Sequence, residues 1–84
     1  MNFPYYGIQL KPRKLENGEY KAGCSISKHS GGKVYVFFPR WELYNTYENK
    51  YAANKNMLFN ALQYLRRNHG FSDTDLKEVK ISNR

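Results

Sequence analysis

The sequence predicts an α+β fold in which a three-stranded antiparallel β-meander packs on one long α-helix. Two patterns predict it. Three segments in the first half alternate apolar and polar residues, as half-buried strands do, and residues 46–68 repeat apolar side chains every three or four positions, as an amphipathic helix does. The 84 residues suffice for one small domain, 1–84, with the sheet over about 5–38, the helix over about 46–68 and a short ordered tail over 70–84.

The predicted strands alternate so that one face of the sheet is apolar. They cover residues 5–11, 19–27 and 33–38, and the glycine-rich residues 29–32 mark the turn between the second and the third. In the third strand this pattern places Val36 inward and leaves Tyr35 and Phe37 facing outward. The residues expected to face inward are Tyr6, Ile8, Leu10, Tyr20, Ala22, Cys24, Ile26, Val34, Val36 and Phe38.

The first hairpin contains a conflict between its turn and its apolar pattern. A two-residue turn at residues 17–18 (Asn-Gly) would place Leu10 opposite Ser25, with apolar and polar residues on the same face. One extra residue in the first strand restores Leu10 opposite Cys24. We expect this extra residue as a β-bulge at residues 12–14, because proline has no N–H to donate to the neighbouring strand.

The helix is the clearest element of the sequence. Asn45 or Thr46 can cap its start, and Gly70 suits the left-handed position just past its end. Arg66 and Arg67 lie near that end, where the helix dipole favours cations. The apolar stripe is formed by Tyr47, Tyr51, Leu58, Ala61, Leu62 and Leu65.

The segments on either side of the helix are less regular. Residues 39–45 are expected to connect the third strand to the helix, because Pro39 is typical of a strand end. In the tail, residues 72–75 (Ser-Asp-Thr-Asp) are typical of a helix start, whereas residues 79–81 (Val-Lys-Ile) are typical of a strand. We expect a short helical turn at 73–78.

The sequence contains no pattern typical of an enzyme, and we expect a non-enzymatic protein without a cofactor or metal. Cys24 is the single cysteine, on the inward face, and His29 and His69 lie far apart in the sequence. No small-molecule substrate is indicated. The first residues lack the basic and apolar segments of a secretion signal, and no apolar stretch has the length of a membrane span. We therefore expect a cytoplasmic protein with no membrane partner.

The charge balance indicates a polyanionic partner. The formal net charge is +7, and most of the excess lies in residues 1–41, the half that contains the predicted sheet. On the outward face of that sheet, cations would contact phosphates and aromatic rings would stack on bases, so we predict binding of DNA or RNA. The candidate nucleic-acid-binding residues are Lys11, Arg13, Lys14, Lys21, Lys28, Lys33, Tyr5, Tyr35 and Phe37.

A second hypothesis assigns the same face to protein interaction. Tyr35 and Phe37 on an outward sheet face could form the centre of a homodimer interface, where aromatic residues are enriched. Lysine residues on a sheet can also serve only to keep its edges from aggregating. A homodimeric interaction module is therefore the alternative to nucleic-acid binding.

Residues 6–22 carry a resemblance to known proteins. The order Gly7, an aliphatic strand, then 12–15 (Pro-Arg-Lys-Leu), 17–18 (Asn-Gly) and 20–22 (Tyr-Lys-Ala) resembles the start of small uncharacterised bacterial domains that end in a helix. The resemblance implies a β-β-β-α order and no particular function. In element order alone the chain is also similar to AP2-type and integrase N-terminal DNA-binding domains, whose sheet lies in the major groove; their arginine and tryptophan positions are not matched here.

Overall fold

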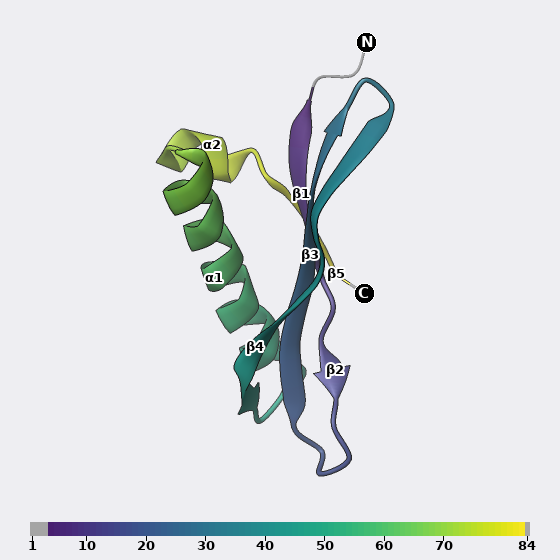
Figure 1. Cartoon of the computed structure of the whole chain (residues 1–84). Helices are drawn as coiled ribbons and strands as arrows, with labels where there is room; N and C mark the ends of the chain where they lie inside the picture. Colours follow the sequence, from purple (N-terminus) through teal and green to yellow (C-terminus); the bar gives the residue numbers. More distant parts are fainter. Residues whose placement is uncertain (1–3, 84) are drawn as a thin grey trace.

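A mixed sheet of five strands covers one side of a long helix in the computed structural model, which describes residues 4–83 (Figure 1). Residues 1–3 and 84 of the predicted domain lie outside the described residues. The α+β class is therefore confirmed. The elements in chain order are β1 (Tyr5–Leu10), β2 (Arg13–Lys14), β3 (Tyr20–Ser30), β4 (Lys33–Tyr47), α1 (Lys50–His69), α2 (Asp73–Lys77) and β5 (Lys80–Asn83).

Strand β3 is the centre of the sheet. β4 pairs with one of its edges, and β1 followed by β2 pairs with the other, all antiparallel. β5 then pairs with the free edge of β1 in parallel. The predicted three-stranded meander is therefore incomplete, because the end of the predicted tail returns to the sheet. A parallel neighbour requires a long connection, and here β2, β3, β4, α1 and α2 all lie between β1 and β5 in the chain.

The register of the first hairpin is as predicted, but the extra residue is not where we expected it. Leu10 lies opposite Cys24, and beyond the proline Arg13 lies opposite Lys21 in the same register, so residues 12–14 contain no bulge. The extra residue lies in the turn, which has three residues, 16–18, rather than two. Leu15 N–H donates to Glu19 C=O at 2.7 Å, and Gly18 adopts φ 87°. A three-residue turn with a left-handed glycine corrects the register by itself.

The second hairpin reverses the faces that we expected for the start of β4. Gly31 and Gly32 have φ of 57° and 80° and form a two-residue turn, so Val36 lies opposite Ser27. Val36 therefore faces away from the helix together with Val34, and Tyr35 and Phe37 face the helix side. Register shifts further along β4 bring Phe38 opposite Ile26, as the apolar pattern required.

The predicted connection at residues 39–45 is instead the second half of β4. Pro39 does not end the strand. It lies between two pairs with different registers on an edge strand, a position where a missing N–H is tolerated. Trp41 pairs opposite Cys24 and, like Leu43, packs partly buried against the core.

Helix α1 begins later than predicted and uses a different cap. Asn49 is the N-cap, and its side chain accepts a hydrogen bond from Ala52 N–H at 2.8 Å, whereas Asn45 and Thr46 belong to β4. Gly70 ends the helix at φ 67°, as predicted. The predicted stripe residue Tyr51 is exposed. The buried residues of α1 are Ala53, Met57, Ala61 and Leu65, spaced four apart.

Both patterns in the tail correspond to real structure. Ser72 and Asp75 form a reciprocal capping box at the start of α2, within the predicted helical turn at 73–78. The strand pattern becomes β5, preceded by the buried Val79. The core between sheet and helix consists of Ile8, Leu10, Ala22, Cys24, Ile26, Ala53, Met57, Ala61, Leu65 and Val79.

Candidate functional site

The sheet surface opposite α1, which we name the outer face, is the candidate site. Along β1 and β3 the residues that alternate with the buried core point to this face, and cross-strand pairing extends it to the other strands. The outer face consists of Tyr5, Gly7, Gln9, Lys11, Arg13, Lys21, Gly23, Ser25, Ser27, His29, Val34, Val36, Arg40, Glu42, Lys80 and Ser82.

The middle of the outer face is a shallow depression of about 650 Å³. Gly7 lies in its lining without a side chain, and an added Cβ would make ordinary contacts of 3.8 Å with His29, Ser27 and the Lys80 carbonyl. Gln9, Ser25 and Ser27 also line it and offer uncharged hydrogen-bonding groups. Lys11 and Lys80 are the two cations of the lining.

One end of the depression is closed by a stack of side chains from three strands. The Tyr5 ring stacks on His29 of β3 with centroids 4.6 Å apart, and Lys80 Nζ of β5 lies 4.1 Å from the Tyr5 ring centroid. Because β3 and β5 flank β1 on opposite sides, both faces of the Tyr5 ring are covered. His29 Nε2 is also 3.2 Å from Ser27 Oγ. Tyr5 is therefore not free to stack on a base, contrary to the role we expected for it.

The other end of the outer face is organised by Glu42. Arg13 donates to both carboxylate oxygens, at 2.9 and 3.1 Å, and Arg40 Nη2 donates to Oε2 at 3.0 Å. Arg40 also donates to the Lys11 carbonyl at 3.2 Å. The cluster crosses β3 at Gly23, where a Cβ would lie only 2.8 Å from that same carbonyl. The absence of a side chain is therefore what allows these groups to meet.

The two arginines fix the charge of this cluster. Hydrogen bonding and charge attraction from Arg13, and then from Arg40, lower the pKa of Glu42 to about 2 despite partial desolvation. The same hydrogen bond raises the pKa of Arg13. Glu42 is therefore a carboxylate at neutral pH and balances one of the two guanidinium charges, so the cluster retains a net positive charge.

The predicted binding residues divide between the two faces of the sheet. Tyr5, Lys11 and Lys21 lie on the outer face, as expected, and Arg13, which we expected in a β-bulge, lies there too. The others face the helix side. Lys14, Lys28, Lys33, Tyr35 and Phe37 occupy that side.

The predicted binding residues on the helix side either contact other side chains of the fold or lie near the ends of strands. Lys28 Nζ lies 5.9 Å from the Tyr6 ring centroid, and the Phe37 ring packs on both Tyr6 and His69. Lys33 and Tyr35 belong to the exposed part of the second hairpin, which is remote from the Glu42 cluster along β4. These five residues therefore do not form one continuous surface with the outer face.

Sequence reasoning missed two cations of the outer face, Arg40 and Lys80. Lys80 reaches the site because β5 pairs with β1, and Arg40 because β4 continues past Pro39. The sequence did contain a signal for which side chains of β4 point to the outer face. A two-residue turn at 31–32 requires Val34 to lie opposite His29, which reverses the faces we assigned.

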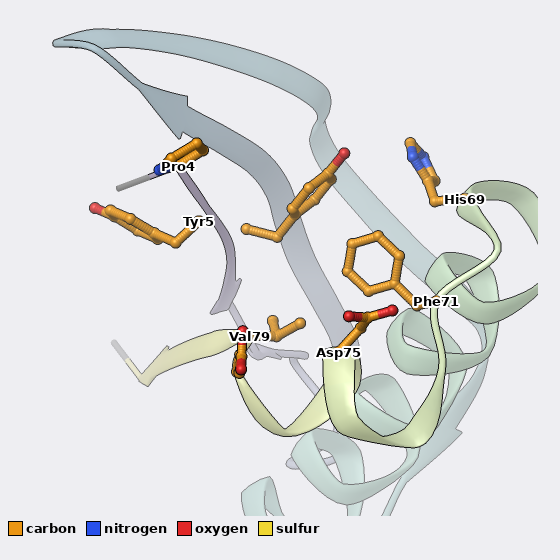
Figure 2. Close-up of a pocket in the computed structure, with 8 residues that line it drawn as sticks. Pro4, Tyr5, His69, Phe71, Asp75 and Val79 are labelled. Atoms are coloured by element: carbon orange, nitrogen blue, oxygen red, sulfur yellow. The ribbon is translucent and has the colours of Figure 1, made fainter. Parts of the chain in front are cut away.

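A second cavity, of about 310 Å³, lies on the helix side of the sheet. Figure 2 shows Pro4 and Tyr5 on one side of it and His69, Phe71 and Asp75 on the other. In the capping box, Ser72 N–H donates to the Asp75 carboxylate at 2.9 Å, and the Ser72 hydroxyl accepts from Asp75 N–H at 3.2 Å. Hydrogen bonding from Ser72 lowers the pKa of Asp75. With this carboxylate and that of Glu78 in its lining, the cavity repels a polyanion, so it is not part of the candidate site.

The single cysteine of the chain lies in the core. Cys24 is fully buried, and desolvation raises the pKa of its thiol to about 11, so the reactive thiolate is scarce at neutral pH. Within residues 4–83 no three His, Cys, Asp or Glu side chains are grouped as metal ligands. No helix in this part of the chain is long and apolar enough to cross a membrane.

Comparisons with known proteins do not constrain the function further. No family model, curated protein or solved structure matches this chain.

Proposed function

We propose that this chain is a cytoplasmic, non-enzymatic protein that binds DNA or RNA through the outer face. The observation that supports it best is the arrangement of charge around the depression. Cations lie at both ends of the outer face, and between them is a strip of glycine, serine and glutamine without a charged side chain. The cations are Lys11, Arg13, Lys21, Arg40 and Lys80.

Each part of this arrangement suits a part of a nucleic acid. Lysine and arginine neutralise phosphates and release counterions, which supplies most of the affinity. Gln9, Ser25 and Ser27 can donate to and accept from base edges. The bare backbone at Gly7 permits close approach of a sugar–phosphate chain. The proposal uses Lys11, Lys80 and the Glu42 cluster and omits the residues that face the helix side.

The alternative proposal is a homodimer that uses the rim of the same face. Val34 and Val36 are 54% and 55% exposed on the outward side of β4, an edge strand of the sheet. Exposed valines beside an unpaired strand edge are typical of a surface that pairs with another chain. Such a dimer depends on apolar burial, whereas nucleic-acid binding depends on charge.

The first experiment titrates a fluorescent mixed-sequence oligonucleotide pool at several salt concentrations. The variants Lys11→Ala and Lys80→Ala should each weaken binding of all sequences and reduce the salt slope by about 0.7–0.9, as expected for one lost phosphate contact. Lys33→Ala is the matched control, because this lysine belongs to the same sheet but faces the helix side. It should leave the slope nearly unchanged.

A gain of affinity gives an independent test. Glu42→Gln removes the carboxylate that balances Arg13 and Arg40, so affinity at low salt should rise several-fold. Unchanged affinity and slope in the Lys11→Ala/Arg40→Ala/Lys80→Ala variant would eliminate the outer face as the binding surface.

Light scattering separates the two proposals. A dimer held by Val34 and Val36 should persist in 0.5 M salt and dissociate in the Val34→Ser/Val36→Ser variant, because salt does not screen apolar burial. A salt-resistant dimer that binds no oligonucleotide at 50 mM salt would replace nucleic-acid binding by the interaction function.

A further inference from the structure

Among the large apolar and aromatic side chains of residues 4–83, that of Tyr44 is the most exposed, with an exposed fraction of 93%. Its exposure follows from an irregularity of β4. Glu42 lies opposite Gly23 and Thr46 lies opposite Lys21, so β4 contains two residues more than β3 in this interval. Extra residues in one strand disrupt the ladder locally and redirect side chains, and here Tyr44 lies in the displaced segment.

The displaced segment is held in place rather than left free. Lys21 Nζ donates hydrogen bonds to the carbonyl oxygens of Leu43 and Tyr44. The preceding side chain, Leu43, packs against the core, and the Lys21 ammonium lies 5.6 Å from the Tyr44 ring centroid. The backbone that carries the ring is thus held at the edge of the outer face before any ligand binds, which lowers the entropy cost of using the ring.

The neighbours of Tyr44 are cationic. Lys21 pairs with Arg13 across β2 and β3, and Arg13 is joined through Glu42 to Arg40. An exposed aromatic ring beside a row of cations is the combination that binds single-stranded nucleic acid, because the ring stacks on an unpaired base while the cations contact the nucleic-acid backbone. In a duplex the base faces are already stacked and offer no such contact.

We propose that Tyr44 stacks on an unpaired base, so that the ligand of the outer face carries a single-stranded segment. This inference rests on the proposed nucleic-acid function. It also assigns the stacking role that Tyr5, Tyr35 and Phe37 do not fill, since the Tyr5 ring is covered on both faces and the other two face the helix side.

The test compares single-stranded DNA, single-stranded RNA and a duplex of the same sequence by fluorescence anisotropy. Tyr44→Ala should weaken single-strand binding about five-fold or more and leave duplex binding unchanged. Tyr44→Phe keeps the ring and should bind within two-fold of the unmodified protein, whereas Tyr44→Leu should resemble Tyr44→Ala. Tyr51→Ala is the matched control, because Tyr51 is 75% exposed but lies on α1.

The outcomes separate the two proposals. If the unmodified protein binds no oligonucleotide, both the proposed function and this inference fail. If it binds but Tyr44→Ala and Tyr51→Ala have equal affinities, or if the duplex is preferred, only the inference is overturned. Thermal unfolding of the four variants should match that of the unmodified protein, because both tyrosines are solvent-exposed.

Discussion

Two glycines of the outer face have different roles at the level of single residues. Gly7 and Gly23 both occupy positions at which a side chain would point to this face, but their surroundings differ. An added Cβ would lie 3.8 Å from its nearest neighbours at Gly7 and 2.8 Å from the Lys11 carbonyl at Gly23. The first distance is an ordinary contact. The second requires the backbone to move, because the obstructing atom is not the end of a flexible side chain.

Gly23→Ala should therefore destabilise the protein by roughly 1–3 kcal/mol, the usual cost of forcing a group into an occupied space. Gly7→Ala is the control and should change the free energy of unfolding by no more than about 0.5 kcal/mol. Urea unfolding followed by tyrosine and tryptophan fluorescence measures both values. Equal effects of the two substitutions would show that the close approach of Lys11 is not a constraint.

The Glu42 carboxylate predicts a pH dependence of stability. Its folded pKa of about 2 is below the value of about 4.3 expected in the unfolded chain. A lowered folded pKa means that the stabilisation is present above about pH 4.3 and is lost as the pH falls towards 2. Because water reaches this ion pair, we expect a contribution of about 1 kcal/mol.

Glu42→Gln should therefore be less stable than the unmodified protein by about 1 kcal/mol at pH 7, and most of the difference should be lost by pH 2. Urea unfolding at a series of pH values provides the measurement. A difference that stays constant from pH 7 to pH 2 would contradict the assignment of the acid dependence to Glu42.

At the level of elements, the start of α1 shows how a cap is chosen. Asn45, Thr46 and Asn49 all have side chains suited to an N-cap. However, β4 continues to Tyr47, so Thr46 pairs with Lys21 and Asn45 lies in the irregular segment just before it. The helix can begin only where the strand has ended, so Asn49 becomes the cap.

Asn49→Ala should reduce the free energy of unfolding by about 1 kcal/mol, because it leaves the Ala52 N–H without its acceptor. Asn45→Ala removes the same side chain from an exposed position before the helix and should have little effect. Parallel urea titrations of the two variants decide between these caps. A larger loss for Asn45→Ala would place the functional cap where the sequence pattern first indicated it.

At the level of the whole molecule, the core is a single thin layer between sheet and helix. The principal extents are 46 × 24 × 17 Å, so the shortest dimension has room for only two layers. Cys24 lies fully buried in the middle of this layer, opposite both Leu10 and Trp41. Reagents can therefore reach its thiol only when sheet and helix separate.

Cys24 should react with iodoacetamide at pH 7 far more slowly than an unfolded cysteine, since it is both buried and, with a pKa of about 11, protonated. The rate should rise in urea in parallel with global unfolding. Mass spectrometry of timed samples gives the rate, and the protein in 6 M guanidinium serves as the control. Rapid modification of the native protein would contradict a closed core.

Sequence patterns predicted much of the fold correctly, where local signals agreed. The alternation in β1 and β3 indicated Leu10 opposite Cys24, and Gly70 ended the helix as expected. The outer face was predicted in part, because Lys11 and Lys21 follow the alternation of β1 and β3, whereas the position of Arg13 was obscured by the bulge that we expected at residues 12–14. Its position opposite α1 followed from the same alternation.

The sequence by itself determined the α+β class, the inward faces of β1 and β3 and the basic character of the sheet, because each depends on short-range periodicity and composition. Only the tertiary structure decided that β4 continues past Pro39, that it carries extra residues that expose Tyr44, and that β5 brings Lys80 beside Tyr5. These features depend on pairing between segments far apart in the chain. Strand register is set by the partner strand and the packing between layers, which local propensity does not encode.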